Sequence, residues 1–369
     1  SEMCIRDRGG HVVWQTKQVR IDRDRALFGE LTYDLTDKFS ATVGARYFEY
    51  ENSLYGFNGH VGYCTGYYDD NGDFVEDREN GTPQYPCFDT GILDDISEGD
   101  DWAFKASLEW RLSPDALLYA TWSEGFRAGG VNRARDTGVP KYDPDWVYNY
   151  EIGWKTTWAG GRVRFNGAAY IVDWDDFQYA FLDYTVSPLT IIQNAGKAQT
   201  KGIEWDVNWA MTDNFTLTFA GSYNDAKLQE DFVRVDSENV GTVAAPKGTE
   251  MPYVPELQMT AIGRYTFDVG ELPMFGQFAV SYADKNWNNL ETDNRFLIDS
   301  ATVLNLTAGI EKEKWSLTLY ANNVTDERMT TDIFNAGYYQ YTGITFSGFD
   351  YGETVIRPPS YGIRWSQRF

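Results

Sequence analysis

The feature that most constrains this chain is a period-two alternation of apolar and polar residues, in blocks of about ten. In one block, Phe215, Leu217 and Phe219 alternate with Thr216 and Thr218. Successive side chains of a strand point to opposite faces, so each block has one apolar and one polar face. No helical periodicity competes over a comparable length. The pattern predicts an all-β protein, and similar blocks begin near residues 39, 102, 304 and 315.

The connections between these blocks alternate strictly between short and long. A soluble sandwich gives no reason for this alternation, whereas an antiparallel transmembrane β-barrel has short periplasmic turns and long extracellular loops. The short turns contain the Gly, Pro, Asp and Asn that hairpins favour. They lie at 35–38, 112–115, 159–161, 211–214, 269–273 and 311–314. The long polar connections are roughly 51–100, 127–145, 175–200, 226–254, 286–298 and 326–356.

The six short turns predict twelve strands, and a thirteenth runs from about Arg357 to the C-terminus. Single-chain bacterial barrels have an even number of strands, so about thirteen indicates a truncated barrel or a miscount by one. Tryptophans near the strand ends suit an interfacial girdle, although a soluble core or a ligand-stacking platform would also use them. The expected strands are 20–34, 38–50, 101–112, 115–126, 146–158, 162–174, 200–210, 214–225, 256–268, 275–286, 299–310, 315–325 and 357–369.

Composition excludes several functions. The 369 residues carry a formal net charge of −23, which disfavours nucleic acid as a partner. Two His and three Cys leave little for a metal site, and His11 and His60 are isolated. No nucleophile elbow, phosphate loop or zinc-protease motif occurs, so we assign no catalytic, cofactor-binding or metal-binding residue and no enzymatic activity.

The first residues differ from the rest of the chain. Residues 1–8 show neither strand alternation nor the apolar core of a signal peptide. We expect 1–10 to be a non-native or disordered segment, with disorder of a native terminus as the alternative. The barrel domain is then 11–369.

The longest connection carries two cysteines and many acids. Cys64 and Cys87 are candidates for a disulfide, because the cell exterior is oxidising; two free thiols are the alternative. Acidic and amide side chains between Asp69 and Asp77 would suit calcium, but Gly72 is out of place for an EF-hand. We favour a solvated acidic loop that divalent ions bridge to lipopolysaccharide.

Two further groups of side chains lie in long connections. Arg127, Arg133, Arg135 and Lys141 could attract an anionic ligand, and ordinary rim charge is the alternative. Aromatic residues in the last connection could stack on a ligand, while glycines among them favour a mobile loop. We assign no ligand residue here; the aromatics are Tyr338, Tyr339, Tyr341 and Phe346.

Several segments resemble, in order, the C-terminal barrel of TonB-dependent outer-membrane receptors. Tyr150-Glu-Ile-Gly-Trp-Lys155 is similar to that family's Tyr-Glu-x-Gly-x-Lys strand, and the Asn-Asn-Val-Thr-Asp run at 322–326 to its Asn-Leu-Thr-Asp segment. Each string is weak individually, but their order over 26–369 is specific. The other segments are 26–37, 118–130, 194–205 and 357–369.

The resemblance implies a 22-stranded barrel, of which this chain would supply about the last thirteen strands. The family's N-terminal plug and TonB-contacting box have no counterpart in these residues. The full-length protein would lie in the Gram-negative outer membrane, among lipid and lipopolysaccharide. It would import a scarce small-molecule ligand with energy from the TonB complex, which it contacts through the plug region. A ferric siderophore is the commonest ligand class; cobalamin, haem and oligosaccharides are others.

The terminal strand has its own expected role. Tyr361, Ile363 and Trp365 occupy alternate positions before Phe369, and the resemblance implies that they are the signal for the outer-membrane barrel assembly machinery. An exposed C-terminal edge can be captured by strand addition. A plain lipid-facing strand face is the alternative.

Two other classes of protein share parts of this pattern. One is a passive porin-like channel, a complete barrel without a plug. The other is a secreted all-β carbohydrate-binding protein or glycosidase. The membrane interpretation fails if the apolar strand faces are buried between two stacked sheets.

Overall fold

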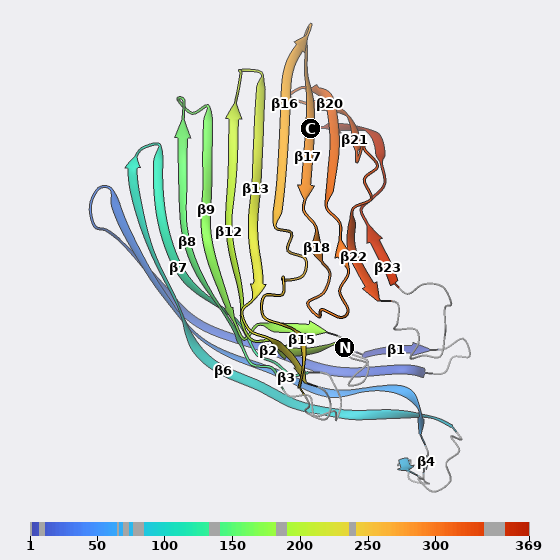
Figure 1. Cartoon of the computed structure of the whole chain (residues 1–369). Helices are drawn as coiled ribbons and strands as arrows, with labels where there is room; N and C mark the ends of the chain where they lie inside the picture. Colours follow the sequence, from blue (N-terminus) through green and yellow to red (C-terminus); the bar gives the residue numbers. More distant parts are fainter. Residues whose placement is uncertain are drawn as a thin grey trace.

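The computed structural model describes residues 2–6, 12–64, 66–68, 74–76, 85–132, 141–181, 190–235, 241–335 and 351–368. Its main feature is one 14-stranded sheet, in which every strand pairs antiparallel with its neighbours (Figure 1). In sheet order the strands are β1 (Glu2–Arg6), β2 (Val12–Asp34), β3 (Phe39–Cys64), β6 (Tyr85–Ser113), β7 (Ala116–Arg127), β8 (Asp145–Trp158), β9 (Val163–Asp175), β12 (Ala198–Ala210), β13 (Phe215–Leu228), β16 (Leu257–Val269), β17 (Leu272–Ala283), β20 (Ala301–Glu311), β21 (Trp315–Asn322) and β24 (Ser360–Gln367).

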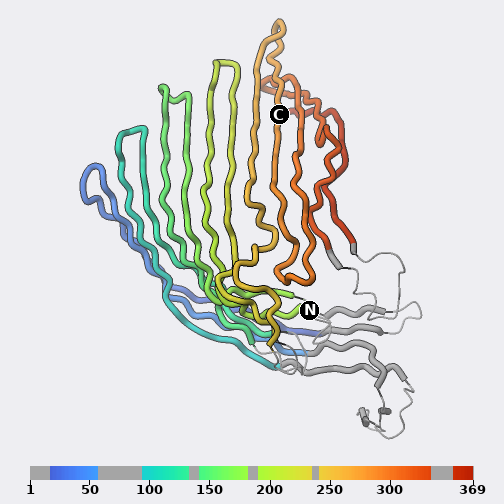
Figure 2. Tube along the Cα trace, viewed as in Figure 1, coloured from blue at the N-terminus to red at the C-terminus, as the bar shows by residue number. Residues whose placement is uncertain are grey.

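This sheet confirms the predicted all-β, antiparallel architecture. Its strands follow one another as a meander, with the short turns at one end and the long connections at the other (Figure 2). All thirteen predicted strands are present, and β1 is an additional one. Among the described residues β1 and β24 are the two edges and do not pair with each other, so the curved sheet is open.

The described residues contain no helix, and therefore none of the length and apolar character needed to cross a bilayer. The short strand β1 falls within the segment that we expect to be non-native or disordered, and it pairs with β2. That residues 1–10 are a non-native or disordered segment remains a prediction.

The register of the sheet collects apolar side chains on one face. Ile152 on β8 lies opposite Ala120 on one side and Ala169 on the other, and Ala169 lies opposite Ile203. These side chains point away from the long-loop hairpins, and Ile152 is 65% exposed. The apolar face is therefore open rather than buried between two stacked sheets. We call it the outer face, and the opposite face the lumen face.

Aromatic rings on the outer face cover glycines of neighbouring strands. Trp154 covers Gly167, Trp205 covers Gly221, and a Cβ added at Gly167 would lie 2.3 Å from the Trp154 ring. Such pairs restore the packing that a glycine removes from a strand. They explain why glycine recurs inside strands that the alternation predicts correctly.

Three strands extend further than predicted. β3 and β6 continue through much of 51–100, which we expected to be a loop, and β2 begins at Val12 rather than near residue 20. The three strands form a long ribbon across the long-loop end (Figure 1). On its outer face the ribbon carries charged residues such as Glu49 and Asp100. The expectation was wrong because backbone pairing continues where the outer face no longer needs to be apolar.

Short two-stranded ladders occupy five of the six long connections, which we expected as loops; between β7 and β8 the described residues form only an isolated bridge from Gly130 to Tyr142. The pairs are β4 (Gly66–Tyr68) with β5 (Phe74–Glu76), β10 (Gln178–Phe181) with β11 (Ile191–Asn194), β14 (Phe232–Val235) with β15 (Gly241–Ala245), β18 (Asn286–Trp287) with β19 (Leu297–Ile298), and β22 (Thr330–Asn335) with β23 (Tyr351–Val355).

Candidate functional site

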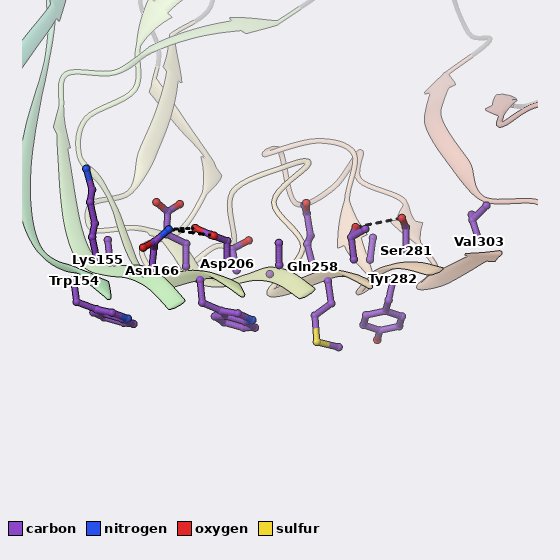
Figure 3. A pocket seen from close by; sticks show the side chains of 18 of the residues that line it. Trp154, Lys155, Asn166, Asp206, Gln258, Ser281, Tyr282 and Val303 are labelled. Carbon is purple, nitrogen blue, oxygen red and sulfur yellow. Dashed lines mark hydrogen bonds between the residues drawn. The ribbon is translucent and has the colours of Figure 1, made fainter. Parts of the chain in front are cut away.

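The lumen face is a polar wall. In Figure 3, Trp154 and Tyr282 point to one side of the sheet, while Lys155, Asn166 and Asp206 point to the other. The polar side has a hollow of about 700 Å³ that spans several strands from β7 to β20. Such a face is suited to water and polar solutes, as the lumen of a wide barrel requires.

Polar side chains on this wall bond to one another across strands. Tyr119 Oη donates to Glu151 Oε1 at 2.6 Å, and Asn166 Nδ2 donates to Asp206 Oδ1 at 3.2 Å. Further along the same row of the sheet, the hydroxyl groups of Thr260 and Ser281 form a hydrogen bond of 3.2 Å. The wall can therefore exchange hydrogen bonds with a passing solute or with a protein segment in the lumen. Its hydroxyls, amides and carboxylates form no nucleophile–base arrangement among the described residues.

An apolar cluster caps the lumen face at the long-loop end. The hairpins β10–β11 and β14–β15 pack there with the segment around Leu290, and Phe232, Ala245 and Leu290 are fully buried. Trp174, Ala198 and Leu228 support the cluster from below; they share the lumen-facing register of Asn166 and Asp206. We call this assembly the cap, and its buried members are Phe177, Phe181, Ile191, Ala195, Ala198, Leu228, Phe232, Ala245 and Leu290.

Tyr179 joins two parts of the cap. Its hydroxyl donates to Asn289 Oδ1 at 2.5 Å and accepts the Leu290 N–H at 3.3 Å. Burial, with a smaller contribution from Glu291, raises the pKa of Tyr179 to about 12. An ion pair at 3.3 Å between Arg234 and Glu291 links the β14–β15 hairpin to the same segment. These contacts make the cap a packed unit.

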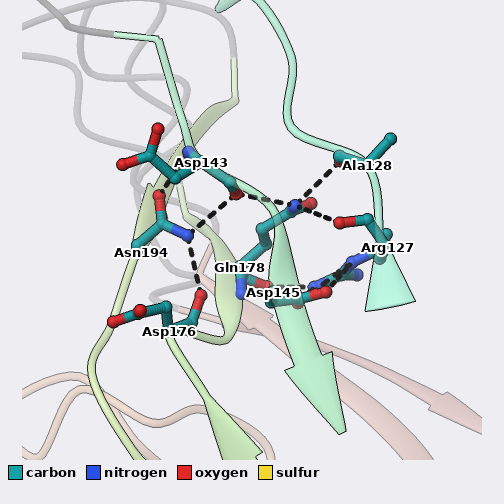
Figure 4. A network of polar contacts seen from close by, with 7 residues as sticks. All are labelled: Arg127, Ala128, Asp143, Asp145, Asp176, Gln178 and Asn194. Atoms are coloured by element: carbon teal, nitrogen blue, oxygen red, sulfur yellow. Dashed lines mark hydrogen bonds and ion pairs between the residues drawn. The ribbon is translucent and has the colours of Figure 1, made fainter. Parts of the chain in front are cut away.

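A polar network fixes β10 to the ends of β7 and β8 (Figure 4). Arg127 Nη2 lies 2.5 Å from Asp145 Oδ2, and the Asp145 side chain is only 2% exposed. The same carboxylate accepts the Gln178 N–H at 2.9 Å. Gln178 Nε2 donates to the carbonyls of Ala128 and Asp143, at 2.9 Å and 3.0 Å. The buried carboxylate of Asp145 at the start of β8 therefore links Arg127 on β7 to Gln178 on β10, and it holds the long-loop rim of the sheet together.

Asn194 extends the network to the end of β9. Its Nδ2 donates to the Asp143 and Asp176 carbonyls at 3.0 Å and 2.7 Å, and its Oδ1 accepts the Asp143 N–H at 2.8 Å. In the sequence, Asn194 belongs only to the segment 194–205 that resembles the receptor family, and nothing predicts a role for Asp145 or Gln178. Contacts across 33 to 51 residues have no local periodicity that could reveal them.

The structure describes two of the four predicted rim cations, and both form ion pairs. Arg127 is paired with Asp145, and its guanidinium lies 5.6 Å from the Trp174 ring. Lys141 Nζ is 2.6 Å from Asp95 and also donates to the Ile96 carbonyl. For these two residues the structure supports the rim-charge interpretation. The other candidates lie outside the described residues: Arg133, Arg135, Tyr338, Tyr339, Tyr341 and Phe346.

The two candidate cysteines lie on paired strands. Cys64 on β3 is opposite Tyr85, and Cys87 on β6 is opposite Gly62, so the cysteines are offset by two positions. Their disulfide stays a prediction. Most of the acidic segment from Asp69 to Asp77 lies outside the described residues, and the part of the chain that the structure describes contains no group of acids, His or Cys suited to a metal.

The terminal strand β24 presents its alternate side chains on the outer face. Tyr361, Ile363 and Trp365 are 69%, 71% and 56% exposed and lie opposite outward residues of β21. Phe369 lies outside the described residues. The assembly role of these four residues stays a prediction.

Comparisons with known proteins agree with this architecture. The family model described as "TonB dependent receptor-like, beta-barrel" matches residues 9–324. The pesticin receptor of Yersinia pestis is 21% identical over 309 residues, which are 83% of this chain and 39% of that protein. The metal-pseudopaline receptor CntO of Pseudomonas aeruginosa is 24% identical over 232 residues, 63% of this chain and 29% of that protein.

A solved structure shows the same fold. The ferric yersiniabactin uptake receptor FyuA from Yersinia pestis has a TM-score of 0.70 at 18% identity, covering 96% of this chain and 47% of that one. This chain thus spans less than half the length of these relatives. With an open apolar outer face, a polar lumen face and a match over most of its length, the chain belongs to the TonB-dependent receptors, the β-barrel proteins of the Gram-negative outer membrane.

Proposed function

We propose that this chain is the barrel wall of a receptor that imports a scarce small-molecule ligand, with a ferric siderophore as the first candidate. Cobalamin, haem and oligosaccharides are the alternative ligand classes. The known relatives support a metal chelate: one takes up ferric yersiniabactin and another is a receptor for metal-pseudopaline.

The observation that carries the proposal is the cap on the lumen face. Its hairpins fold inward and are locked by the Arg127–Asp145 pair and by Tyr179. A packed cap gives the barrel mouth a defined shape, which selective capture of a dilute ligand requires. Below it, the wall offers hydrogen-bonding groups around a hollow of about 700 Å³.

The proposal includes three partners. Energy would come from the TonB complex through an N-terminal plug region of the full-length protein. Lipid and lipopolysaccharide would surround the outer face, and the barrel assembly machinery would bind the terminal strand with Tyr361, Ile363, Trp365 and Phe369.

Uptake in the native host tests the proposal. A strain lacking the gene should lose accumulation of a radiolabelled ferric siderophore under iron limitation, and the full-length gene should restore it. Deleting tonB should abolish the same uptake. Accumulation that persists without TonB would favour a passive channel, and a protein recovered from buffer rather than from outer membranes would favour the secreted carbohydrate-binding alternative.

A further inference from the structure

We propose that the outer face binds one lipid specifically: an acyl chain lies in an apolar groove between β3 and β12, and the anionic phosphate of the same lipid binds Lys201. The groove is open to the surroundings, has a volume of about 770 Å³ and is lined almost entirely by apolar surface. It is separate from the cap and from the lumen hollow, so it serves the barrel's contact with the membrane rather than ligand uptake.

The floor of the groove consists of small side chains. Ala106, Ala120 and Ala169 lie on outward positions of β6, β7 and β9. Trp122 and Tyr150, directly opposite one another on β7 and β8, rise beside them. Small residues between large ones leave a depression, and its apolar lining suits a hydrocarbon chain.

Lys201 lies at the long-loop side of this groove. It is exposed on the outer face of β12, opposite Ile171 on β9 and Asp225 on β13. Outward residues nearer the short turns are apolar, beginning with Ile203, whereas Gln199 is the next outward residue toward the long loops. Lys201 therefore marks the boundary between the hydrocarbon and the headgroups of the outer leaflet.

The acids near Lys201 already have partners. Asp225 lies 2.8 Å from Lys227 Nζ, and Asp173 accepts a hydrogen bond from Gln199 Nε2 at 2.6 Å. The Lys201 ammonium has no hydrogen-bond or ion-pair partner among the described residues. A cation at headgroup depth beside an acyl-sized groove is complementary to an anionic phosphate linked to an acyl chain.

Quenching of Trp122 fluorescence tests the proposal on the natural full-length protein in detergent micelles. Micelles would contain either phosphatidic acid or phosphatidylcholine with brominated acyl chains, and the Trp122 contribution is the difference between the native protein and Trp122→Phe. We expect half-quenching at about fivefold lower phosphatidic acid than phosphatidylcholine, the factor that one interfacial lysine is worth.

Matched variants separate the two parts of the site. Lys201→Gln should remove the preference and Lys201→Arg should keep it, while Lys155→Gln, which removes a lumen-facing cation, should have no effect. Ala169→Leu should fill the groove and weaken Trp122 quenching by both lipids, whereas Ala261→Leu, on the outer face of β16, should not. A preference that survives Lys201→Gln, or equal effects of the two leucine variants, would overturn the proposal. So would a dimer that protects Trp122 from both lipids, because a second copy would then occupy the groove.

Discussion

Arg127 and Asp145 form an ion pair in which the carboxylate is buried and the guanidinium is about half exposed, with 2.5 Å between Nη2 and Oδ2. If the pair is broken, the exposed guanidinium of Arg127 can form hydrogen bonds with water. The Gln178 N–H, which also donates to Asp145, is partly buried and cannot do so as easily. Removing Asp145 should therefore cost more stability than removing Arg127, because its loss leaves a partly buried donor without its acceptor.

Replacing Asp145 with Ala should destabilise the rim by about 1–3 kcal/mol, the cost of an unsatisfied buried polar group. Faster amide hydrogen exchange in β10, measured by mass spectrometry, would report the loss. Glu30→Gln is the control: its pair with Lys105 on the lumen face is exposed on both sides and should contribute less than about 1 kcal/mol. Equal exchange in the two variants would show that the network does not hold the rim.

A second prediction concerns the ring that covers Gly167. Gly167→Ala places a Cβ where Trp154 now lies, and overpacking of this kind costs about 1–3 kcal/mol. The thermal midpoint of the folded barrel, followed by gel mobility with and without heating, should fall. Gly276→Ala, also on the outer face but with open space at its Cβ position, should leave the midpoint nearly unchanged. A similar fall in both variants would point to backbone effects instead.

The cap should weaken at alkaline pH. In the folded state the pKa of Tyr179 is about 12, above the usual value near 10, so the folded protein keeps a proton that the unfolded chain loses between these values. The stabilisation is complete below pH 10 and disappears as the pH rises toward 12. Thermal unfolding at pH 8 and pH 11 should show a larger drop for the native protein than for Tyr179→Phe. Equal drops would mean that this phenol does not couple the cap to pH.

The terminal strand provides a test in cells. Ile363→Asp, or removal of Phe369, should reduce the amount of folded protein in outer membranes several-fold, because the assembly machinery would no longer recognise the strand. Arg364→Ala, on the lumen side of the same strand, is the control. If all three variants reach the membrane equally well, the exposed residues of β24 serve only as a lipid-facing surface.

The wall of this protein could be predicted from its sequence, and the cap could not. Alternation such as Phe215, Leu217 and Phe219 identifies a strand with one lipid-facing side, because the bilayer imposes the same requirement on every spanning residue. Beyond the bilayer that requirement ends, so the sequence pattern predicts a loop where the outer parts of β3 and β6 continue as paired strands.

The cap depends on contacts between distant parts of the chain. Tyr179 and Asn289 are 110 residues apart, and each lies in a segment without a periodic pattern. Neither residue differs locally from an ordinary loop residue. Their roles follow from the fold of the sheet, which brings the connections after β9, β13 and β17 to one end.

Site-directed spin labelling along β12 tests the central claim most directly. Single cysteines at positions 203–208 of the full-length protein, with the native cysteines replaced by serine, would carry the label in lipid vesicles. Labels at Ile203, Trp205 and Val207 should be accessible to oxygen dissolved in the bilayer, and those at the intervening positions to a water-soluble nickel complex. Alternation with a period of two supports a wall between lipid and a wetted lumen; uniform access to the nickel complex at all six positions would contradict it.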